Sequence, residues 1–457
     1  MTAEKLSFGD FWSRFQAAEK RAGAFDLIIS GVQIYPMLRV KIFYALAQAL
    51  GIYDDPHPAS EKPAESVGKA IAAMDTLKPA PVIVIPFNRL VAGAEPYSDR
   101  IVELLEGAGI EPRTIKYLDP AADLDIARLR ESFVARFETQ ANELLAVQHK
   151  FRKSLNRAES KKRWADLIAT LEGEFGVKLP NFEPYPYWLL RHSIIDELGF
   201  KEFFGSLKTK DVYIVNAYTD PRFVRAARMA GVKVHDIQHG FVSKQHPAYS
   251  FLPGTVVQSA SDELLTWGEY WNTAGSFPKG MTARTTGPTK AMMEYRALAL
   301  AENRIRPNQV LFTSQGAIGR ELFEAAFATA KSQPNLEVNF RLHPNESLEG
   351  FEKQAMDLAA GEPLPSNLSI SHRVPIFLDL VSRSEYLVGA FSTTLFEGLS
   401  LGCKVLVLPL PGFENTLPAI QSGDITLVTD LSQLPKFLAA AKPAADPSRY
   451  YSNVSKL

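Results

Sequence analysis

Three consecutive hydroxyl residues, Ser392, Thr393 and Thr394, stand where the apolar run EYLVGAF passes into the helical pattern TTLFEGLSLG. The first turn of a helix offers unpaired backbone N–H groups and the positive end of the helix dipole, and the hydroxyls add further donors. Such a turn can bind a phosphate. Glu397 lies one turn further on and could accept hydrogen bonds from a ribose. The alternative is an ordinary N-cap with Glu397 in a capping box.

A second candidate is the strand end EVNF followed by Arg341, His343 and Pro344. Residues two apart in an extended chain point the same way, and the proline biases His343 towards extended geometry and ends the strand. A guanidinium beside an imidazole is a compact set of donors for a phosphate. The alternative is a strand-terminal histidine that caps a neighbouring loop.

A third strand end, QVLFT, is followed by Ser314, Gln315 and Gly316. Because the carboxyl ends of parallel strands meet at one edge of a sheet, we expect these three segments to converge on a single anion. The sequence therefore predicts a nucleotide-phosphate site in this part of the chain.

A different chemistry is suggested by His235, His239 and His246, three of the eight histidines within twelve residues. Together with Asp236 they follow or belong to the run VKVHDI. A histidine or aspartate at such a strand end could deprotonate an acceptor hydroxyl or bind an acidic sugar, so His239 and Asp236 are candidate bases. The alternative is that His239 has only a structural role. We expect no metal, since His235 belongs inside the strand and no second ligand-rich segment or HExxH spacing occurs.

The acceptor side has weaker candidates, all near predicted strand ends. Asp220 follows DVYIV and is either a base or the N-cap of the helix PRFVRAARM. Arg39 could reach an anionic acceptor or form a salt bridge. The remaining acceptor candidates are Asn88, Arg89, Gln238 and His246.

Short apolar runs alternate with helical patterns over most of the chain and would position these residues. After Asn308 the runs QVLFTSQ, EVNFRLHP, EYLVGAF and KVLVLPL indicate parallel strands buried on both faces. Earlier, FDLIIS, PVIVIPF, PRTIKYL, DVYIVNAY, VKVHDIQ and ELLTWG suggest a second such sheet, with a helical insertion at about 120–198. The segment 275–308 contains Pro and Gly residues of the kind that interrupt helices and strands, which is typical of a linker between domains.

The predicted fold class is therefore α/β, with two doubly wound Rossmann-like domains facing a cleft. We predict an N-terminal domain at 1–284, a C-terminal domain at 285–440, and a tail at 441–457 that packs back on the N-terminal domain.

Composition excludes several classes of protein. A chain of 457 residues with 46% hydrophobic and 22% charged residues is neither disordered nor fibrous. A net charge of -1 gives no support to a nucleic-acid partner, and one cysteine excludes a disulfide framework and a thiolate zinc site. With no signal peptide and no apolar run near the ~20 residues of a membrane span, we expect a cytoplasmic protein, with peripheral contact at the inner membrane left open.

The segments RLHPNES and GAFSTTLFEGLSLG resemble the His-Pro and serine motifs of bacterial GT-B glycosyltransferases that use CMP-activated acidic sugars, namely the sialyltransferases and the Kdo transferases. The same pair resembles the CDP-glycerol glycerophosphotransferases of teichoic-acid synthesis. The segment DIQHGFVSKQHPAYSF with ELLTWGEYW looks like surface-polysaccharide proteins of this group. The resemblance covers roughly residues 210 to 430 and is looser in GVQIYPMLR and VIVIPFNRL.

The resemblance implies a GT-B fold, in which 1–284 would be the acceptor domain and 285–440 the nucleotide-sugar-binding domain, and it assigns roles to matching residues. His343, Ser392 and Thr393 would hold the nucleotide phosphate, with Glu397 near the ribose. His239 would occupy the place of the catalytic histidine of the teichoic-acid enzymes, although Gln238 replaces their preceding tryptophan. The paired-acid-glycine motif that supplies the base in sialyltransferases is not plainly present.

The expected function is transfer of a sugar from a nucleotide donor, CMP-linked Kdo or a sialic-acid-like sugar, to a growing bacterial surface glycan or lipid-linked glycan. Apart from Asp123-Leu124-Asp125 in the predicted helical insertion, no Asp-x-Asp sequence occurs, so we expect neither metal nor cofactor. The alternatives are CDP-polyol phosphotransfer, sugar-nucleotide epimerisation and a non-catalytic GT-B subunit that binds glycan.

Overall fold

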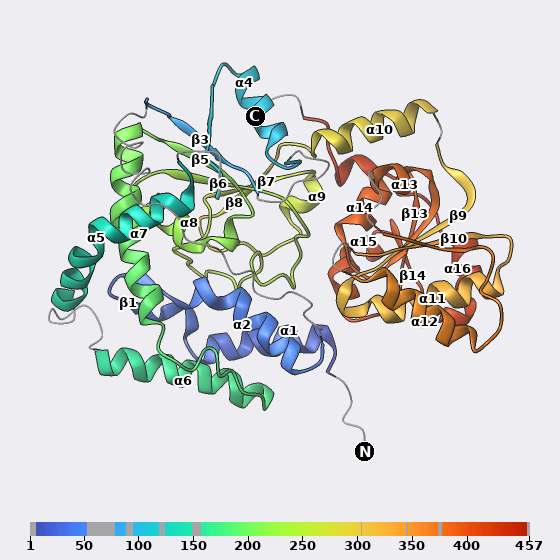
Figure 1. Cartoon of the computed structure of the whole chain (residues 1–457), viewed down its shortest axis with the longest axis horizontal. Coiled ribbons are helices and arrows are strands. Elements are labelled where there is room, and N and C mark those ends of the chain that lie inside the picture. The colour runs from blue at the N-terminus through green and yellow to red at the C-terminus, as the bar shows by residue number, and fades with distance from the viewer. Residues whose placement is uncertain are drawn as a thin grey trace.

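The computed structural model describes residues 6–52, 78–87, 95–117, 124–148, 157–302, 304–343, 346–372 and 377–454. Its described part contains two six-stranded parallel sheets, one in each half of the molecule (Figure 1). The α/β class with two Rossmann-like domains, expected for a GT-B fold, is confirmed by this arrangement.

The first sheet has the order β4 (Arg113–Thr114), β3 (Val82–Ile85), β5 (Asp211–Val215), β6 (Lys233–Ile237), β7 (Glu263–Thr266) and β8 (Thr282–Thr285). Its central strands are almost wholly buried, because helices cover both faces. α8 (Pro221–Met229) and α4 (Asp99–Gly107) pack on the sheet, α2 (Tyr35–Ala49) contacts α8, and α1 (Phe8–Arg21) lies further out against α6 (Arg157–Phe175).

The second sheet has the order β11 (Leu368–Ser371), β10 (Glu337–Arg341), β9 (Arg306–Thr313), β12 (Ser384–Gly389), β13 (Lys404–Val407) and β14 (Ile425–Leu427). β9 lies between β10 and β12, so the winding reverses there and leaves a crevice at the carboxyl ends of these strands. The helices of this domain are α11 (Gly319–Ser332), α12 (Leu348–Ala359), α13 (Phe377–Arg383), α14 (Thr393–Ser400), α15 (Leu417–Gln421) and α16 (Leu434–Ala440).

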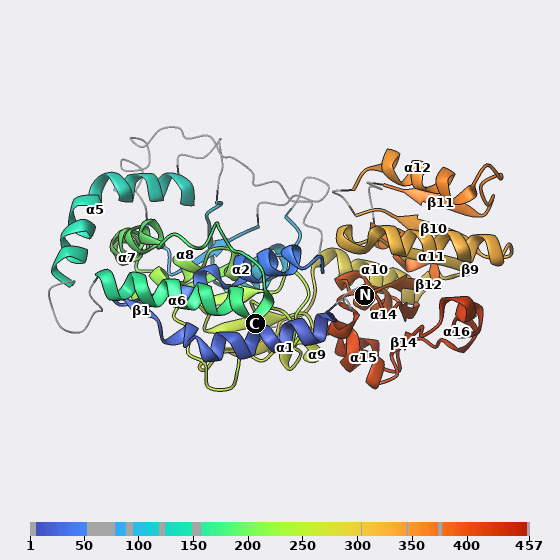
Figure 2. The same cartoon turned by 90° about the horizontal axis from the view of Figure 1, so that it is seen from below.

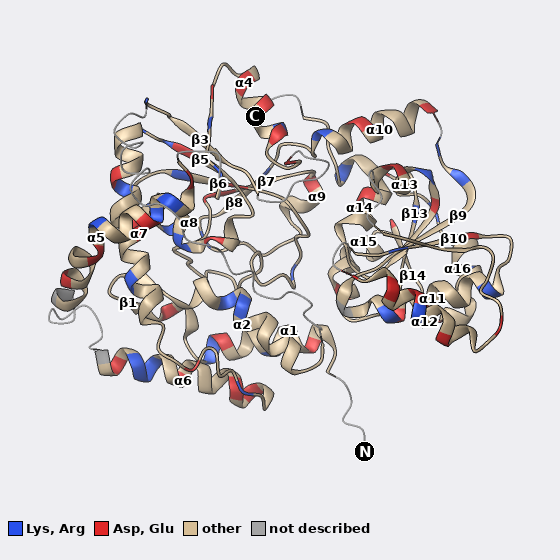
Figure 3. Ribbon diagram, in the orientation of Figure 1, with Lys and Arg blue, Asp and Glu red and all other residues tan. Residues whose placement is uncertain are grey.

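The helical segment expected at about 120–198 consists of α5 (Ile126–Gln148), α6 (Arg157–Phe175) and α7 (Tyr187–Leu207). α5 and α7 lie on the side of the first domain that faces away from the second, and α6 runs beside α1 (Figures 1 and 2). Charges of both signs are spread over the helices of both domains (Figure 3). Over the described residues, no helix is long and apolar enough to cross a bilayer.

One local prediction differs from the structure. The run FDLIIS contributes no strand to the parallel sheet: β1 (Ile28–Ile29) pairs antiparallel with β2 (Val32–Gln33), since Ser30 and Gly31 both have positive φ and form a two-residue hairpin turn. The segment expected to be a linker at 275–308 contains the edge strand β8 and the helix α10 (Lys290–Glu302).

An aromatic cluster joins the two domains. Trp271 packs against Phe396 of α14 at 4.8 Å between ring centroids, and its indole N–H donates to the carbonyl of Tyr450 at 2.8 Å. The C-terminal segment continues along the first domain, where the N–H of Ser452 donates to the carbonyl of Trp267. The seam is thus built by residues from three distant parts of the chain.

Candidate functional site

A cleft of about 330 Å³ opens between the two domains, beside the carboxyl ends of strands β6, β9 and β12. Five residues singled out from the sequence line it: His239 and His246 from the first domain, and Gln315, Ser392 and Thr393 from the second. The remaining lining residues are Phe8, Phe43, Tyr44, Phe87, Tyr97, Gly240, Phe241, Gln245, Pro247, Phe391 and Asn415.

Ser392 is the N-cap of α14. Its backbone is extended and its hydroxyl accepts the N–H of Thr394 at 3.2 Å. With Ser392 at the N-cap, the third helical residue is Leu395, so Glu397 stands too far along to complete a capping box. Glu397 and Thr394 are not among the lining residues, and burial raises the pKa of Glu397 to about 7.

The loop after β9 is tied to the loop after β12. The side-chain oxygen of Gln315 accepts the backbone N–H of Phe391 at 3.0 Å, next to the N-cap of α14. Gly316 begins the short 3-10 helix η3 (Gly316–Ile318) beyond this bond. Two of the three predicted strand ends therefore meet at the cleft wall.

The end of β10 is linked to the end of β9 through Glu346, a residue that the sequence reasoning did not single out. Its carboxylate accepts the hydroxyl of Ser314 at 2.7 Å and the backbone N–H of His343 at 2.6 Å. Burial raises the pKa of Glu346. Ser314 and His343 thus lie together but behind the cleft lining, while Pro344 falls outside the described residues.

Arg341 is buried at the end of β10, where its guanidinium donates to the carbonyl of Ser371 at 3.3 Å and lies over the ring of Phe377. Burial lowers its pKa. Among the described residues no carboxylate forms an ion pair with it. Arg341 ends β10, whose carboxyl end lies at the same edge of the sheet as the carboxyl end of β9. Its positive charge is therefore at the edge where the phosphate site is predicted.

On the opposite wall, His239 is surrounded by aromatic rings. The centroids of Phe87, Tyr218 and Tyr97 lie 5.8, 5.8 and 6.2 Å from the imidazole. Its neighbour Gln238 is fully buried and points away from the cleft: its side chain accepts from the N–H of Trp267 and donates to the carbonyl of Gly240. Gln238 therefore holds the loop and does not face an acceptor.

His246 is a neutral donor in this wall. Burial, with smaller contributions from His239 and Arg39, lowers its pKa to about 3. Its Nδ1 accepts the N–H of Ala248 at 3.2 Å, so the single proton of the neutral ring is on Nε2.

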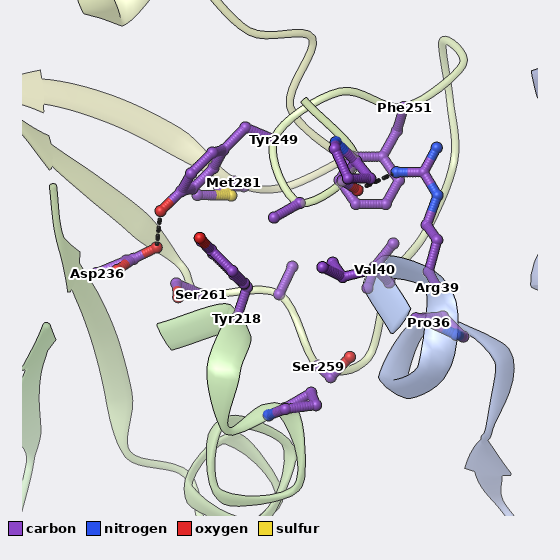
Figure 4. Close-up of a pocket in the computed structure, with 15 residues that line it drawn as sticks. Pro36, Arg39, Val40, Tyr218, Asp236, Tyr249, Phe251, Ser259, Ser261 and Met281 are labelled. Carbon is purple, nitrogen blue, oxygen red and sulfur yellow. Dashed lines mark hydrogen bonds between the residues drawn. The ribbon is translucent and has the colours of Figure 1, made fainter. Parts of the chain in front are cut away.

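Asp236 and Arg39 do not line this cleft but a second, smaller cavity of about 40 Å³ (Figure 4). Asp236 accepts the N–H of Ala217 and the hydroxyl of Tyr249, and burial raises its pKa to about 7. Arg39 is 1% exposed and paired with Glu19, so it cannot reach an acceptor from the surface as the sequence suggested.

Asp220 is engaged elsewhere as well. It caps α8 by accepting the N–H of Phe223, and it forms an ion pair with Arg130 of α5 at 2.8 Å. The helix-cap alternative is therefore the one observed. Asn88 and Arg89 lie outside the described residues.

The cleft residues missed from the sequence include the aromatic Phe8, Phe43, Tyr44 and Phe391 and the polar Asn415. In the sequence they belong to ordinary helix or loop patterns, and only the fold brings them together. Over the described residues, no group of three His, Cys, Asp or Glu side chains could hold a metal ion.

Comparison with models of protein families finds no match, and comparison with curated proteins finds none either. Solved structures do match. The Methanocaldococcus jannaschii UDP-GlcNAc 2-epimerase in complex with UDP-GlcNAc and UDP is 13% identical with a TM-score of 0.43, covering 81% of this chain and 95% of that one.

Two further matches have similar values. The S. aureus MnaA–UDP co-structure is 13% identical with a TM-score of 0.46, covering 82% of this chain and 94% of that one. Acinetobacter baumannii MurG is 15% identical with a TM-score of 0.39, covering 79% and 93%. At these identities the likeness concerns the fold alone.

Proposed function

We propose that this chain is a glycosyltransferase that moves a sugar from a nucleotide donor to a glycan acceptor. One observation carries the proposal: the N-terminus of α14, with Ser392 and Thr393, and the imidazole of His239 line the same cleft from opposite domains. An anion-binding turn and a candidate base thus lie on facing walls.

The phosphate side of the reaction belongs to the second domain. As the bond between the sugar and the phosphate breaks, its electron pair goes to the leaving phosphate oxygen. The α14 N-terminus and the Ser392 hydroxyl are suited to that growing negative charge, and the buried Arg341 adds positive potential at the same sheet edge. These fixed donors can act without a metal, as we expect for this enzyme.

The acceptor side belongs to the first domain. The acceptor hydroxyl forms a new bond to the anomeric carbon while its proton passes to a base. His239 is the residue we assign to this role, because it lines the cleft whereas Asp220 and Asp236 do not.

The choice of donor and acceptor is based on the resemblance of RLHPNES and GAFSTTLFEGLSLG to the motifs of CMP-sugar transferases. We propose a CMP-linked Kdo or sialic-acid-like donor and a bacterial surface glycan, free or lipid-linked, as acceptor. The enzyme would act in the cytoplasm, with the inner face of the inner membrane as the place where it meets a lipid-linked acceptor.

Nucleotide binding is tested by thermal stabilisation with CMP, CDP, UDP, GDP and ADP, with and without EDTA. A ligand that binds the native state alone raises the melting temperature as its concentration exceeds Kd. We expect CMP to give the largest shift and EDTA to leave it unchanged. A shift with UDP alone would overturn the CMP donor, and no shift with any nucleotide would overturn the proposed function.

A matched pair of variants locates the site. Ser392 and Ser347 are both N-caps, of α14 and α12, and each accepts an N–H of its own helix. Aspartate caps as well as serine does, but it repels a phosphate. Ser392→Asp should weaken nucleotide binding at least tenfold, whereas Ser347→Asp should leave it unchanged; equal binding by both variants would place the anion elsewhere.

The catalytic assignment needs a product assay. His239→Gln should lower the transfer rate by about 10²–10⁴-fold while nucleotide stabilisation persists, since a general base acts on the chemical step. Release of CMP together with transfer of a polyol phosphate, rather than a sugar, would assign the CDP-polyol alternative.

A further inference from the structure

Aromatic rings form most of the cleft wall on the side of the first domain. Phe8 comes from α1, Phe43 and Tyr44 from α2, Phe87 from the end of β3, and Tyr97 from the segment before α4. Phe8 meets Phe43 edge-on at 6.3 Å, and Phe43 meets Tyr44 edge-on at 5.4 Å. The rings support one another and hold their orientations towards the cleft.

Three of these five rings are accessible to a ligand, whereas Phe8 and Phe43 are buried, at 4% and 1% exposed. Tyr44 is 42% exposed, and Phe87 and Tyr97 are half-buried. Phe87 and Tyr97 are edge-on to each other at 6.5 Å, on the same side as His239. A ring held by its neighbours yet open on one side loses little side-chain entropy on binding.

Among the described residues, the first domain contributes no Lys, Arg, Asp or Glu side chain to the cleft lining. His246 stays neutral because burial lowers its pKa to about 3, and its Nε2–H is a donor. Gln245 adds an amide group to the lining. The side chain of Asn415, on the second domain, forms hydrogen bonds within the protein: its amide donates to the carbonyl of Gly412 and its oxygen accepts the hydroxyl of Ser243.

From this wall we infer that the first domain binds an uncharged pyranose, the terminal sugar of the acceptor glycan. The inference rests on the proposed function and names its acceptor class. A pyranose has an apolar C–H face that stacks on aromatic rings and a rim of hydroxyls that pair with imidazole and amide groups. The cleft volume of about 330 Å³ is within the range of small-ligand sites.

The test uses saturation-transfer NMR on the full chain, with and without CMP. The probes are methyl β-D-glucopyranoside and methyl β-D-glucuronide, which share a ring and differ by a carboxylate. We expect the neutral glucoside to receive at least fivefold more saturation, concentrated on its C–H protons. Equal or stronger transfer to the glucuronide would overturn the inference.

Two exposed aromatic residues provide a matched pair of variants. Tyr44→Ala removes a cleft ring that is 42% exposed, and Trp188→Ala removes a ring of α7 that is 56% exposed and lies outside the cleft lining. We expect Tyr44→Ala to reduce the glucoside signal at least fivefold and Trp188→Ala to leave it unchanged. An identical response of the two variants would overturn the inference.

The inference and the proposed function fail in different ways. A nucleotide shift without any glucoside signal would overturn the uncharged acceptor and leave the glycosyltransferase standing. A glucoside signal that depends on Tyr44, in a protein that no nucleotide stabilises, would support the sugar site and overturn the transferase.

Discussion

The wall contributed by the second domain comes from loops at neighbouring strand ends, around Gln315 and Ser392, whereas the wall of the first domain is gathered from residues as distant as Phe8 and His246. The first kind of wall depends on backbone geometry at a helix start. The second depends on packing between helices and loops. We therefore expect the wall of the second domain to tolerate substitutions that the wall of the first domain does not.

Buried charges reinforce this difference. Arg39 and Glu19 are both 1% exposed, and the guanidinium also donates to the carbonyls of Pro247 and Ser250, in the loop that carries His246. It lies 4.4 Å from the ring centroid of Phe251. In the second domain no described ion pair has both side chains this deeply buried: Lys404 and Glu385 are 28% and 19% exposed, and Arg320 and Glu324 are 79% and 44% exposed.

The largest predicted effect concerns the buried ion pair between Arg39 and Glu19. Arg39→Met leaves Glu19 buried without its partner, which should cost about 3–5 kcal/mol of folding free energy. Urea unfolding followed by tryptophan fluorescence measures the loss. Replacing both residues, Arg39→Met with Glu19→Met, should recover much of it, because no uncompensated charge remains.

The matched control is Arg320→Met, which removes a 79% exposed partner of a surface pair and should change stability by less than about 1 kcal/mol. If Arg39→Met cost no more than this control, the proposed difference between the two domains would be wrong.

Much of the second domain could be predicted from the sequence, because its signals are local. EYLVGAF followed by STTLFEGL specifies a buried strand, an N-cap and a helix within one short segment, and the structure has β12, Ser392 and α14 in that order. The aromatic seam at Trp271 could also be anticipated from the run WGEYW. Local chemistry of this kind requires no knowledge of distant contacts.

The acceptor wall could not be predicted in the same way. Arg39 resembles a surface cation in sequence, and only the fold places Glu19 and two carbonyls around it. Phe43 and Tyr44 belong to a helix that is apolar on several sides, so no periodicity marks the side that faces the cleft. Nothing in the sequence around Gln238 indicates that its side-chain nitrogen and oxygen both form hydrogen bonds with backbone groups.

The next largest effect concerns pH. Burial raises the pKa of Asp236 to about 7, above the ordinary aspartate value of about 3.9. Between these values the folded protein holds a proton that the unfolded chain has lost, so Asp236 makes stability fall as pH rises from about 4 to 7, with no further change above. Glu397 has a pKa of about 7 and acts in the same direction in the second domain.

Asp236→Asn should therefore reduce the decline of melting temperature between pH 4.5 and 8, and make the protein more stable than wild type at pH 8 by about 1–3 kcal/mol. Asparagine can still accept from Ala217 and pair with Tyr249. Glu397→Gln is the matched variant in the other domain. An Asp236→Asn variant with the wild-type slope would contradict the prediction.

The smallest effect tests whether the two walls are independent. Ser392→Ala removes one N-cap and should cost about 1 kcal/mol, as should Ser347→Ala at α12. Because the cap acts within its own helix, Ser392→Ala should leave the imidazole NMR signals of His246 unchanged. Arg39→Met should shift them, since Arg39 holds the carbonyl next to His246. If both variants shifted the His246 signals equally, the walls would be coupled, and a nucleotide at α14 would then alter the acceptor wall before any sugar binds there.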